Sequence, residues 1–203
     1  MLFILILVLI AALAVWLRFR SKRMAIGRHA ELRGKVATER TLFTLQIGDV
    51  VQYQAQDWIV ETVYRYHQDQ FEWIEYLLRD NSDAAWLVVA EDDWLEVSWL
   101  TPVADDQLNI HLPPPRYITY EGTYYSLKEK GEARYSTEGR INNQAGSCLF
   151  YDYEAKNGLQ LSLEVYDSKN EGGLDINAGE KIDSRDLSLL PGDGRSVYSK
   201  ISR

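Results

Sequence analysis

An acidic run has the greatest density of chemically active side chains in the chain. Glu91-Asp92-Asp93 is followed closely by Glu96. Carboxylates in this number could attract calcium or a polyamine. The spacing lacks the ligand pattern of a calcium loop, and the run separates two apolar segments, as a solvated turn between strands does. We therefore favour a turn and keep a cation site as the alternative.

The histidines and the cysteine form no catalytic or metal-binding pattern. His29, His67 and His111 lie far apart, and no His-x-x-x-His or paired-Cys motif is present, although a transition-metal site needs such a set. Cys148 precedes two apolar residues, which predicts a small buried side chain rather than a nucleophile. Glycine-rich phosphate loops and a Gly-x-Ser-x-Gly elbow are also missing. We expect no catalytic residue, no metal site and no cofactor.

Two tryptophans, Trp94 and Trp99, lie five positions apart in one predicted strand. An odd separation directs them to opposite faces of that strand. The favoured interpretation is that both are buried between two halves of the domain. The alternative is that one is exposed and anchors a partner protein. With Glu91, Asp92 and Asp93 they are the candidate interaction residues.

The elements that position these residues are predicted to be β-strands, because tryptophan, tyrosine and β-branched residues are frequent. From Leu159 to Val165 apolar residues alternate with polar ones, which predicts a strand with one solvated face. Asn157-Gly158, just before it, is the strongest hairpin signal in the chain. Other strands are predicted near 50–55, 57–67, 70–79, 85–91, 94–100, 123–129, 132–136, 148–155, 173–177 and 187–190.

The first and second halves of this region resemble each other. Tyr53 and Tyr120 match at a separation of 67 residues, and Glu75 and Asp152 match at 77. We interpret the match as an internal duplication. The predicted fold class is all-β, with two similar antiparallel meanders packed as small barrels or a sandwich, preceded by one transmembrane helix.

Each small sheet has one apolar face that it cannot bury alone. Trp86 and Val88 of the first meander should therefore face Leu161 and Leu163 of the second. The β domain is expected at 45–190, with repeat one at about 45–103, a proline-containing connector at 104–116 and repeat two at about 117–190.

The first residues predict a membrane anchor. Met1–Leu17 contains no charge, glycine or proline, and as a helix it would span roughly 25 Å. A transmembrane helix at 1–20 would place the chain in a lipid bilayer. A cleaved signal peptide is the alternative, because Ala12-Leu-Ala14 suits a cleavage site, but no basic residue precedes the apolar run.

Basic residues after the apolar run predict its orientation. The topology-setting residues are Arg18, Arg20, Lys22 and Arg23. They predict a single-pass protein of the inner (cytoplasmic) membrane, with its N-terminus outside and its C-terminal domain in the cytoplasm. A basic, partly helical stalk is expected at 21–44, and a flexible tail at 191–203.

Charge is distributed unevenly. Residues 18–40 hold eight Lys and Arg against two Glu, whereas residues 41–203 hold fourteen Lys and Arg against twenty-eight Asp and Glu. A domain this acidic disfavours nucleic acid as a partner and permits cationic ligands or basic proteins.

A set of scattered aromatic and acidic positions resembles the bacterial domain-of-unknown-function family 4178, from about Leu45 to about Leu190. The matching runs are Gly48-Asp-Val-Val51, Asp57-Trp58, Trp73-Ile-Glu-Tyr-Leu-Leu78, Trp86-Leu87, Glu91-Asp-Asp93 and Tyr120-Glu-Gly122. The resemblance brings no catalytic triad and no ligand set. Some family members are encoded near membrane-stress proteins and polyamine-synthesis enzymes, which implies a role in membrane maintenance or stress.

Together these features predict a non-enzymatic, membrane-tethered interaction or scaffold module with an unknown protein partner. The first alternative is a binding module for a small cation or polyamine on the acidic domain. The second is an enzyme whose site is assembled from scattered residues.

Overall fold

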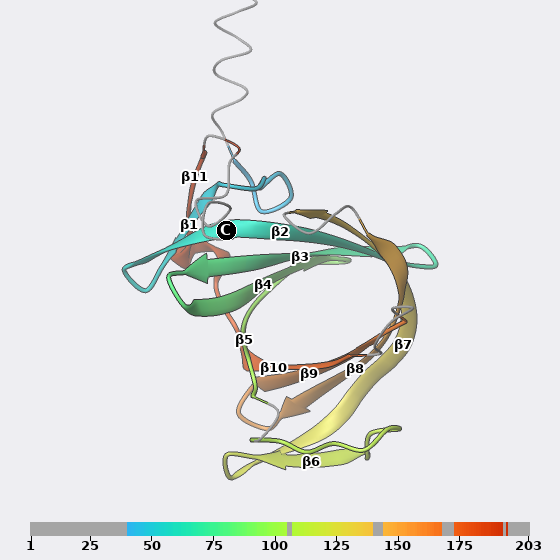
Figure 1. Ribbon diagram of the computed structural model, residues 1–203. Coiled ribbons are helices and arrows are strands. Elements are labelled where there is room, and N and C mark those ends of the chain that lie inside the picture. The colour runs from blue at the N-terminus through green and yellow to red at the C-terminus, as the bar shows by residue number, and fades with distance from the viewer. Residues whose placement is uncertain (1–39, 105–106, 140–143, 168–172, 193, 195–203) are drawn as a thin grey trace, which may run out of the picture. The chain divides into compact units, whose positions relative to one another are not determined.

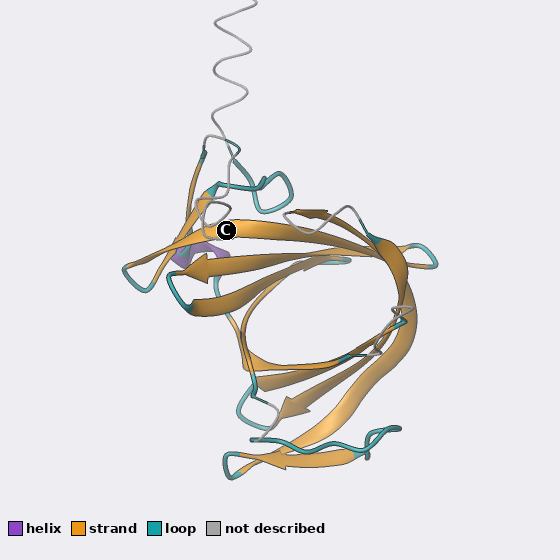
Figure 2. Ribbon diagram, in the orientation of Figure 1, coloured by secondary structure: helices purple, strands orange, loops and turns teal. Residues whose placement is uncertain are grey.

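The computed structural model describes residues 40–104, 107–139, 144–167, 173–192 and 194. This part of the chain is almost entirely β-structure, with one 3₁₀ turn, Ser184–Asp186, as its only helix (Figure 2). The strands are β1 (Val50–Tyr53), β2 (Gln56–Gln68), β3 (Phe71–Asp80), β4 (Asp83–Glu91), β5 (Leu95–Pro102), β6 (Tyr117–Tyr120), β7 (Thr123–Gly139), β8 (Ala145–Ala155), β9 (Leu159–Tyr166), β10 (Leu174–Lys181) and β11 (Ser188–Leu190).

Eight of these strands close into a barrel (Figure 1). The sheet order is β11-β1-β2-β3-β4-β5-β10-β9-β8-β7-β6, and an additional pairing of β2 with β7 joins its two sides. At this junction Tyr66 lies opposite Tyr135. On the other side of the barrel β5 pairs with β10, where Leu100 lies opposite Gly179. All of these pairings are antiparallel.

Short turns of the expected chemistry join neighbouring strands. Asn157-Gly158 connects β8 to β9, and Gly158 has a φ of 84°, a backbone conformation that costs glycine little. The turn between β3 and β4 contains Asn81 with a φ of 53°. The hairpin predicted at Asn157-Gly158 is confirmed.

Two long strands carry the bends that closure requires. β2 has an irregularity between Val60 and Thr62, and β7 has one between Leu127 and Glu129. The first part of β2 pairs with β1, and the part after the bulge pairs with β7. A bulge increases local twist and lets one strand serve two neighbours. The prediction of two separate strands at 123–129 and 132–136 is wrong, because the single strand β7 includes both ranges.

The predicted packing of the fold class is also wrong. The meanders β1–β5 and β6–β10 form one closed barrel with extra strands, instead of two small barrels or a sandwich. Closure pairs strand edges that each five-stranded sheet would leave open. The described residues contain no helix long and apolar enough to cross a membrane. The predicted transmembrane span, residues 1–20, lies outside the described residues.

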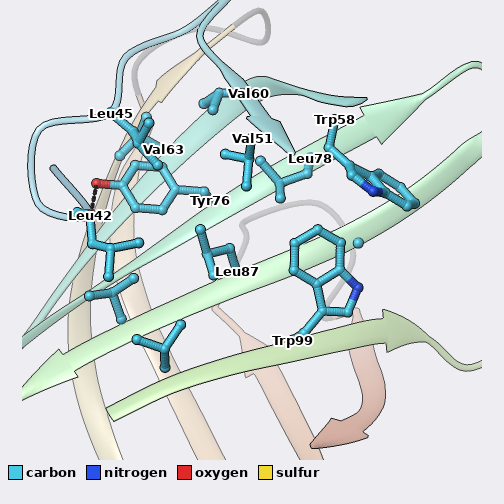
Figure 3. Packing of buried hydrophobic residues seen from close by; sticks show 13 residues of the cluster. Leu42, Leu45, Val51, Trp58, Val60, Val63, Tyr76, Leu78, Leu87 and Trp99 are labelled. Atoms are coloured by element: carbon cyan, nitrogen blue, oxygen red, sulfur yellow. Dashed lines mark hydrogen bonds between the residues drawn. The ribbon is translucent and has the colours of Figure 1, made fainter. Parts of the chain in front are cut away.

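The largest apolar cluster covers the outer face of β2–β5 (Figure 3). Leu42 and Leu45, which precede β1, pack there with Trp58, Tyr76 and other buried residues. The hydroxyl of Tyr76 donates a 2.7 Å hydrogen bond to the backbone oxygen of Leu42. This contact attaches the segment before β1 to the barrel wall.

A second cluster covers the outer face of the second meander. Leu161 and Leu163 pack there with Val103, Ile118 and their neighbours. The expected contact between these leucines and Trp86 is wrong. Trp86 packs against Tyr64 with the ring centroids 5.3 Å apart, on the inner side of the barrel.

Candidate functional site

The inner face of the barrel carries polar and aromatic side chains in register. Glu75 lies opposite Val88, which lies opposite Ser98. Asp152 lies opposite Ser162 on the other side of the barrel. Because successive residues of a strand alternate between faces, the apolar residues between these positions point outward into the two clusters described above.

These inward side chains surround a cavity of about 210 Å³. In the part of the chain that the structure describes, four carboxyl side chains line it, Glu75, Glu96, Glu129 and Asp152, and no lysine, arginine or histidine does. An eight-stranded barrel is wide enough either to be filled by side chains or to hold one small ligand. The cavity therefore presents acceptors of a single charge sign to whatever enters it.

Apolar side chains separate the carboxyl groups. Trp73 and Phe150 line the cavity with their ring centroids 5.6 Å apart in an edge-to-face arrangement. Val88 and Leu100 line it from β4 and β5. Aromatic faces attract cations, and the aliphatic surface suits the apolar body of an organic ligand.

The cavity opens at one end of the barrel. Phe71 and Glu129 line it and are exposed to solvent, whereas Glu75 is 8% exposed. Phe71 and Glu129 thus mark the mouth, and Glu75 marks the innermost part.

Aromatic side chains pack inside the barrel next to Trp73 and Glu75. Tyr66 stacks on Trp73 with their ring centroids 4.9 Å apart. Tyr64, Tyr135 and Tyr166 contact one another. Tyr66 and Tyr135 are buried. These rings fill the part of the barrel interior that lies beside the cavity.

Glu75 is held by a neutral donor. The indole Nε1 of Trp73 donates a 2.9 Å hydrogen bond to Glu75 Oε1. Burial raises the pKa of Glu75 well above its ordinary value, the charge on Glu164 raises it further, and the hydrogen bond from Trp73 lowers it. Desolvation is the largest of these effects because a buried carboxylate loses its water without gaining a cation.

Glu164 lies beside the aromatic residues and is 4% exposed. Its Oε2 accepts a 2.5 Å hydrogen bond from Tyr166 and a 3.4 Å hydrogen bond from Tyr66, and the two hydroxyls lie 2.6 Å apart. Burial raises the pKa of Glu164 to about 7, although the hydrogen bond from Tyr166 lowers it.

Asp152 is a third carboxyl group with a raised pKa. Burial raises the pKa of Asp152 to about 6, against the lowering effect of its hydrogen bond with Ser162. Ser162 Oγ donates this bond over 2.9 Å. Glu129, which lies opposite Asp152 in the sheet, raises the pKa of Asp152 further.

Glu96 is the one cavity carboxylate with a cationic partner among the described residues. Its Oε2 accepts from Lys181 Nζ over 2.7 Å, and its Oε1 accepts from Trp94 Nε1 over 2.8 Å. The hydrogen bonds from Lys181 and then Trp94 lower the pKa of Glu96. This residue stays ionised near the mouth.

The structure separates the two candidate tryptophans. Trp94 is 67% exposed and lies in the turn before β5, whereas Trp99 is 9% exposed. Trp99 packs against Trp58 and Tyr53 on the outer face of the barrel. Only Trp94, through Glu96, reaches the cavity lining.

The acidic run is an exposed turn. Glu91, the last residue of β4, and Asp92 and Asp93, which follow it before β5, are exposed, as the favoured interpretation predicts. Within the described ranges, no group of three or more His, Cys, Asp or Glu residues has an arrangement that could hold a metal ion. Cys148 is buried, as predicted, and burial raises the pKa of its thiol.

The remaining predicted positions fall elsewhere. His67 Nδ1 lies 3.2 Å from Glu72 Oε1 on the surface, and His111 is exposed. The topology-setting residues Arg18, Arg20, Lys22 and Arg23 lie outside the described residues.

Sequence reasoning missed the inner carboxyl groups as a site. Glu75 and Asp152 were matched only as repeat positions, and Glu164 only as part of a solvated face. One signal could have found them. Each is an acidic residue inside a strand of aromatic and aliphatic residues. A charge is rarely buried at such a position, because burial without a partner is energetically unfavourable.

Comparisons with known proteins identify a family and relatives of this chain. The family model "Domain of unknown function (DUF4178)" matches residues 46–184, and the chain belongs to this family. An uncharacterised protein of Aquifex aeolicus is 24% identical over 153 residues, covering 72% of this chain and 83% of its own length. An uncharacterised protein of Mycobacterium bovis is 26% identical over 151 residues, covering 71% of this chain and 70% of its own length. No solved structure matches the chain significantly.

Proposed function

We propose that the protein is a binding module that takes a small organic cation, such as a polyamine or a simpler amine, into the barrel. One observation carries this proposal: among the described residues, four carboxyl side chains and no basic side chain line the cavity. A cation that enters replaces lost water with carboxylate oxygens and aromatic faces. An anion would be repelled by the ionised carboxylates and would lose its water without gaining a cationic partner from the described lining.

The charges at the mouth of the cavity also favour a cationic ligand. Glu129 is exposed at the mouth, and Glu96, which lies near the mouth, is ionised. Acidic residues around an opening attract cations from solution and raise their rate of entry. This attraction weakens as ionic strength rises, because salt screens exposed charges.

The test is a binding series with ligands of one shape and different charge. The full chain is titrated with n-butylammonium, 1,4-butanediammonium, n-butanol and butyrate in a calorimeter. We expect at least one of the two ammonium compounds to bind, and neither butanol nor butyrate. Glu75→Gln should weaken that binding by at least tenfold. Glu132→Gln is the matched control, because Glu132 is exposed on β7 and does not line the cavity.

Binding of butanol or butyrate as tightly as the ammonium compounds would contradict the proposal. So would a lack of binding by both ammonium compounds at millimolar concentration.

A second candidate function is the interaction module expected from the sequence. Tyr117 and Tyr124 stack with their ring centroids 5.3 Å apart, and both are exposed. The guanidinium of Arg116 lies 5.6 Å from the centroid of the Tyr117 ring. Exposed tyrosine and arginine side chains are typical of protein interfaces. Crosslinking in cells should capture a partner that Tyr117→Ala loses and Phe43→Ala, at another exposed aromatic residue, retains.

A further inference from the structure

The innermost carboxyl groups of the barrel come from opposite walls. Glu75 belongs to β3 and Glu164 to β9, and four steps separate these strands in either direction around the eight-stranded ring. Glu75 shares a face with Val88 and Ser98 through register, and Glu164 shares one with Phe150 and Asp175. Both side chains therefore point into the interior of the barrel.

Neutral groups supply the hydrogen bonds of this pair. Trp73 donates to Glu75 over 2.9 Å, and Tyr166 donates to Glu164 over 2.5 Å. Neutral donors stabilise a negative charge, but they do not cancel it.

The other ionisable groups that face the pair are acidic. Asp152 on β8 acts on both glutamates, and Asp175 on β10 acts on Glu164. Tyr66 on β2 faces both, since it hydrogen-bonds Glu164 and its own pKa is raised by the charge on Glu75. No lysine or arginine lines the described cavity.

Two buried carboxyl groups without a cation cannot both be ionised at neutral pH. At least one proton therefore stays with the pair, and the two groups titrate together. A positively charged group that reaches Glu75 would supply the cation that the pair lacks. The pair could then ionise and release the proton.

Resting on the function proposed above, we infer that the ligand's ammonium group replaces the proton held by Glu75 and Glu164, so that each binding event releases one proton. The charge balances: one cation enters the inner end of the cavity and one proton leaves it for solvent. The ligand class is a primary ammonium with an apolar body. Its N–H groups donate to carboxylate oxygen, and its apolar body packs against the cavity-facing surfaces of Trp73 and Phe150.

The test measures proton release directly. The full chain is titrated with n-butylammonium at pH 6.5 in two buffers of different ionisation enthalpy, and the difference in measured heat gives the number of protons released. We expect about one proton per ligand. Between pH 5.5 and pH 7 the affinity should rise by up to about tenfold per pH unit, as exchange of one proton requires.

Two variants locate the exchange. Glu164→Gln keeps the shape of the side chain and removes the charge that raises the pKa of Glu75 further, so proton release at pH 6.5 should decrease and the affinity should depend less on pH. Glu132→Gln, on the outer surface of β7, should behave as the unaltered chain does. Tetramethylammonium carries the same charge without N–H donors and should bind at least tenfold more weakly than n-butylammonium.

The outcomes separate this inference from the proposed function. Binding of n-butylammonium without proton release overturns the exchange and leaves the cation-binding function standing. Undiminished release in Glu164→Gln overturns the assignment to this pair. Tetramethylammonium binding as tightly as n-butylammonium overturns the ligand class. If neither n-butylammonium nor 1,4-butanediammonium binds, the proposed function fails and the exchange fails with it. The proton count of the unaltered chain is informative even if a variant does not fold.

Discussion

Trp73 and Glu75 lie two residues apart on the same face of β3, and the indole Nε1 donates a 2.9 Å hydrogen bond to the carboxyl Oε1. The bond fixes the direction of the innermost carboxyl group without supplying a positive charge. The same indole packs against Tyr66 and Phe150. Trp73 thus contacts both the aromatic rings inside the barrel and the carboxyl group of Glu75.

Stability should decrease as the pH rises from about 4 to above 7. In the unfolded chain Asp152 and Glu164 lose their protons near the ordinary pKa values of 3.8 and 4.5, but in the barrel they keep them until about 6 and about 7. Between these limits the folded state binds more protons, so a rise in pH favours unfolding. For Glu164 the effect is at most about 3 kcal/mol.

Urea unfolding at pH 5, 6, 7 and 8 measures this decrease in the free energy of unfolding. Glu164→Gln should reduce the dependence on pH, and Glu132→Gln should leave it unchanged. Equal stability at pH 5 and pH 8 in the unaltered chain would show that ionisation of these groups does not oppose folding.

Tyr76→Phe should lower the free energy of unfolding by about 1–3 kcal/mol, because it leaves the buried backbone oxygen of Leu42 without its 2.7 Å donor.

Trp58→Phe should lower the free energy of unfolding by about 1 kcal/mol or less. Trp58 Nε1 is buried and has no hydrogen-bond partner among the described residues, so its removal offsets part of the lost packing against Trp99. Chemical denaturation of Tyr76→Phe and Trp58→Phe tests both predictions. A larger decrease in the free energy of unfolding for Trp58→Phe than for Tyr76→Phe would contradict them.

Leu161→Ala should lower the free energy of unfolding by about 2–5 kcal/mol, since Leu161 is fully buried in the outer cluster of the second meander. Leu149→Ala is the comparison, because Leu149 is 43% exposed and its replacement should change stability by no more than about 0.5 kcal/mol. Thermal unfolding of both variants tests the difference. Similar melting temperatures would mean that this outer cluster does not stabilise the barrel.

Gly179→Ala should destabilise the junction between β5 and β10. A Cβ at Gly179 would lie 2.0 Å from the backbone oxygen of Trp99, so the paired strands must move apart. We expect a loss of roughly 1–3 kcal/mol, measured by urea unfolding. Gly173→Ala is the control, because a Cβ there meets nothing within 4 Å. A neutral Gly179→Ala variant would show that the two meanders can separate at this junction without penalty.

The sequence by itself determined most of the strands and the hairpin between β8 and β9. Alternation from Leu159 to Val165 and the Asn157-Gly158 turn predict β9 and the turn before it, and the structure contains both. These signals are local, because side-chain period and turn conformation depend on neighbouring residues. The same local matching related Glu75 to Asp152, although it indicated nothing about what the two carboxyl groups face.

Only the tertiary structure decided which face of each strand is inside the barrel. The polar positions of β9, Gln160, Ser162 and Glu164, read as a solvated face, but Gln160 and Ser162 line the cavity and Glu164 is 4% exposed. A period of two shows that the faces differ, and it does not show what covers them. That depends on the β2–β7 and β5–β10 pairings, which join residues about 70 or more positions apart and leave no pattern within a single strand.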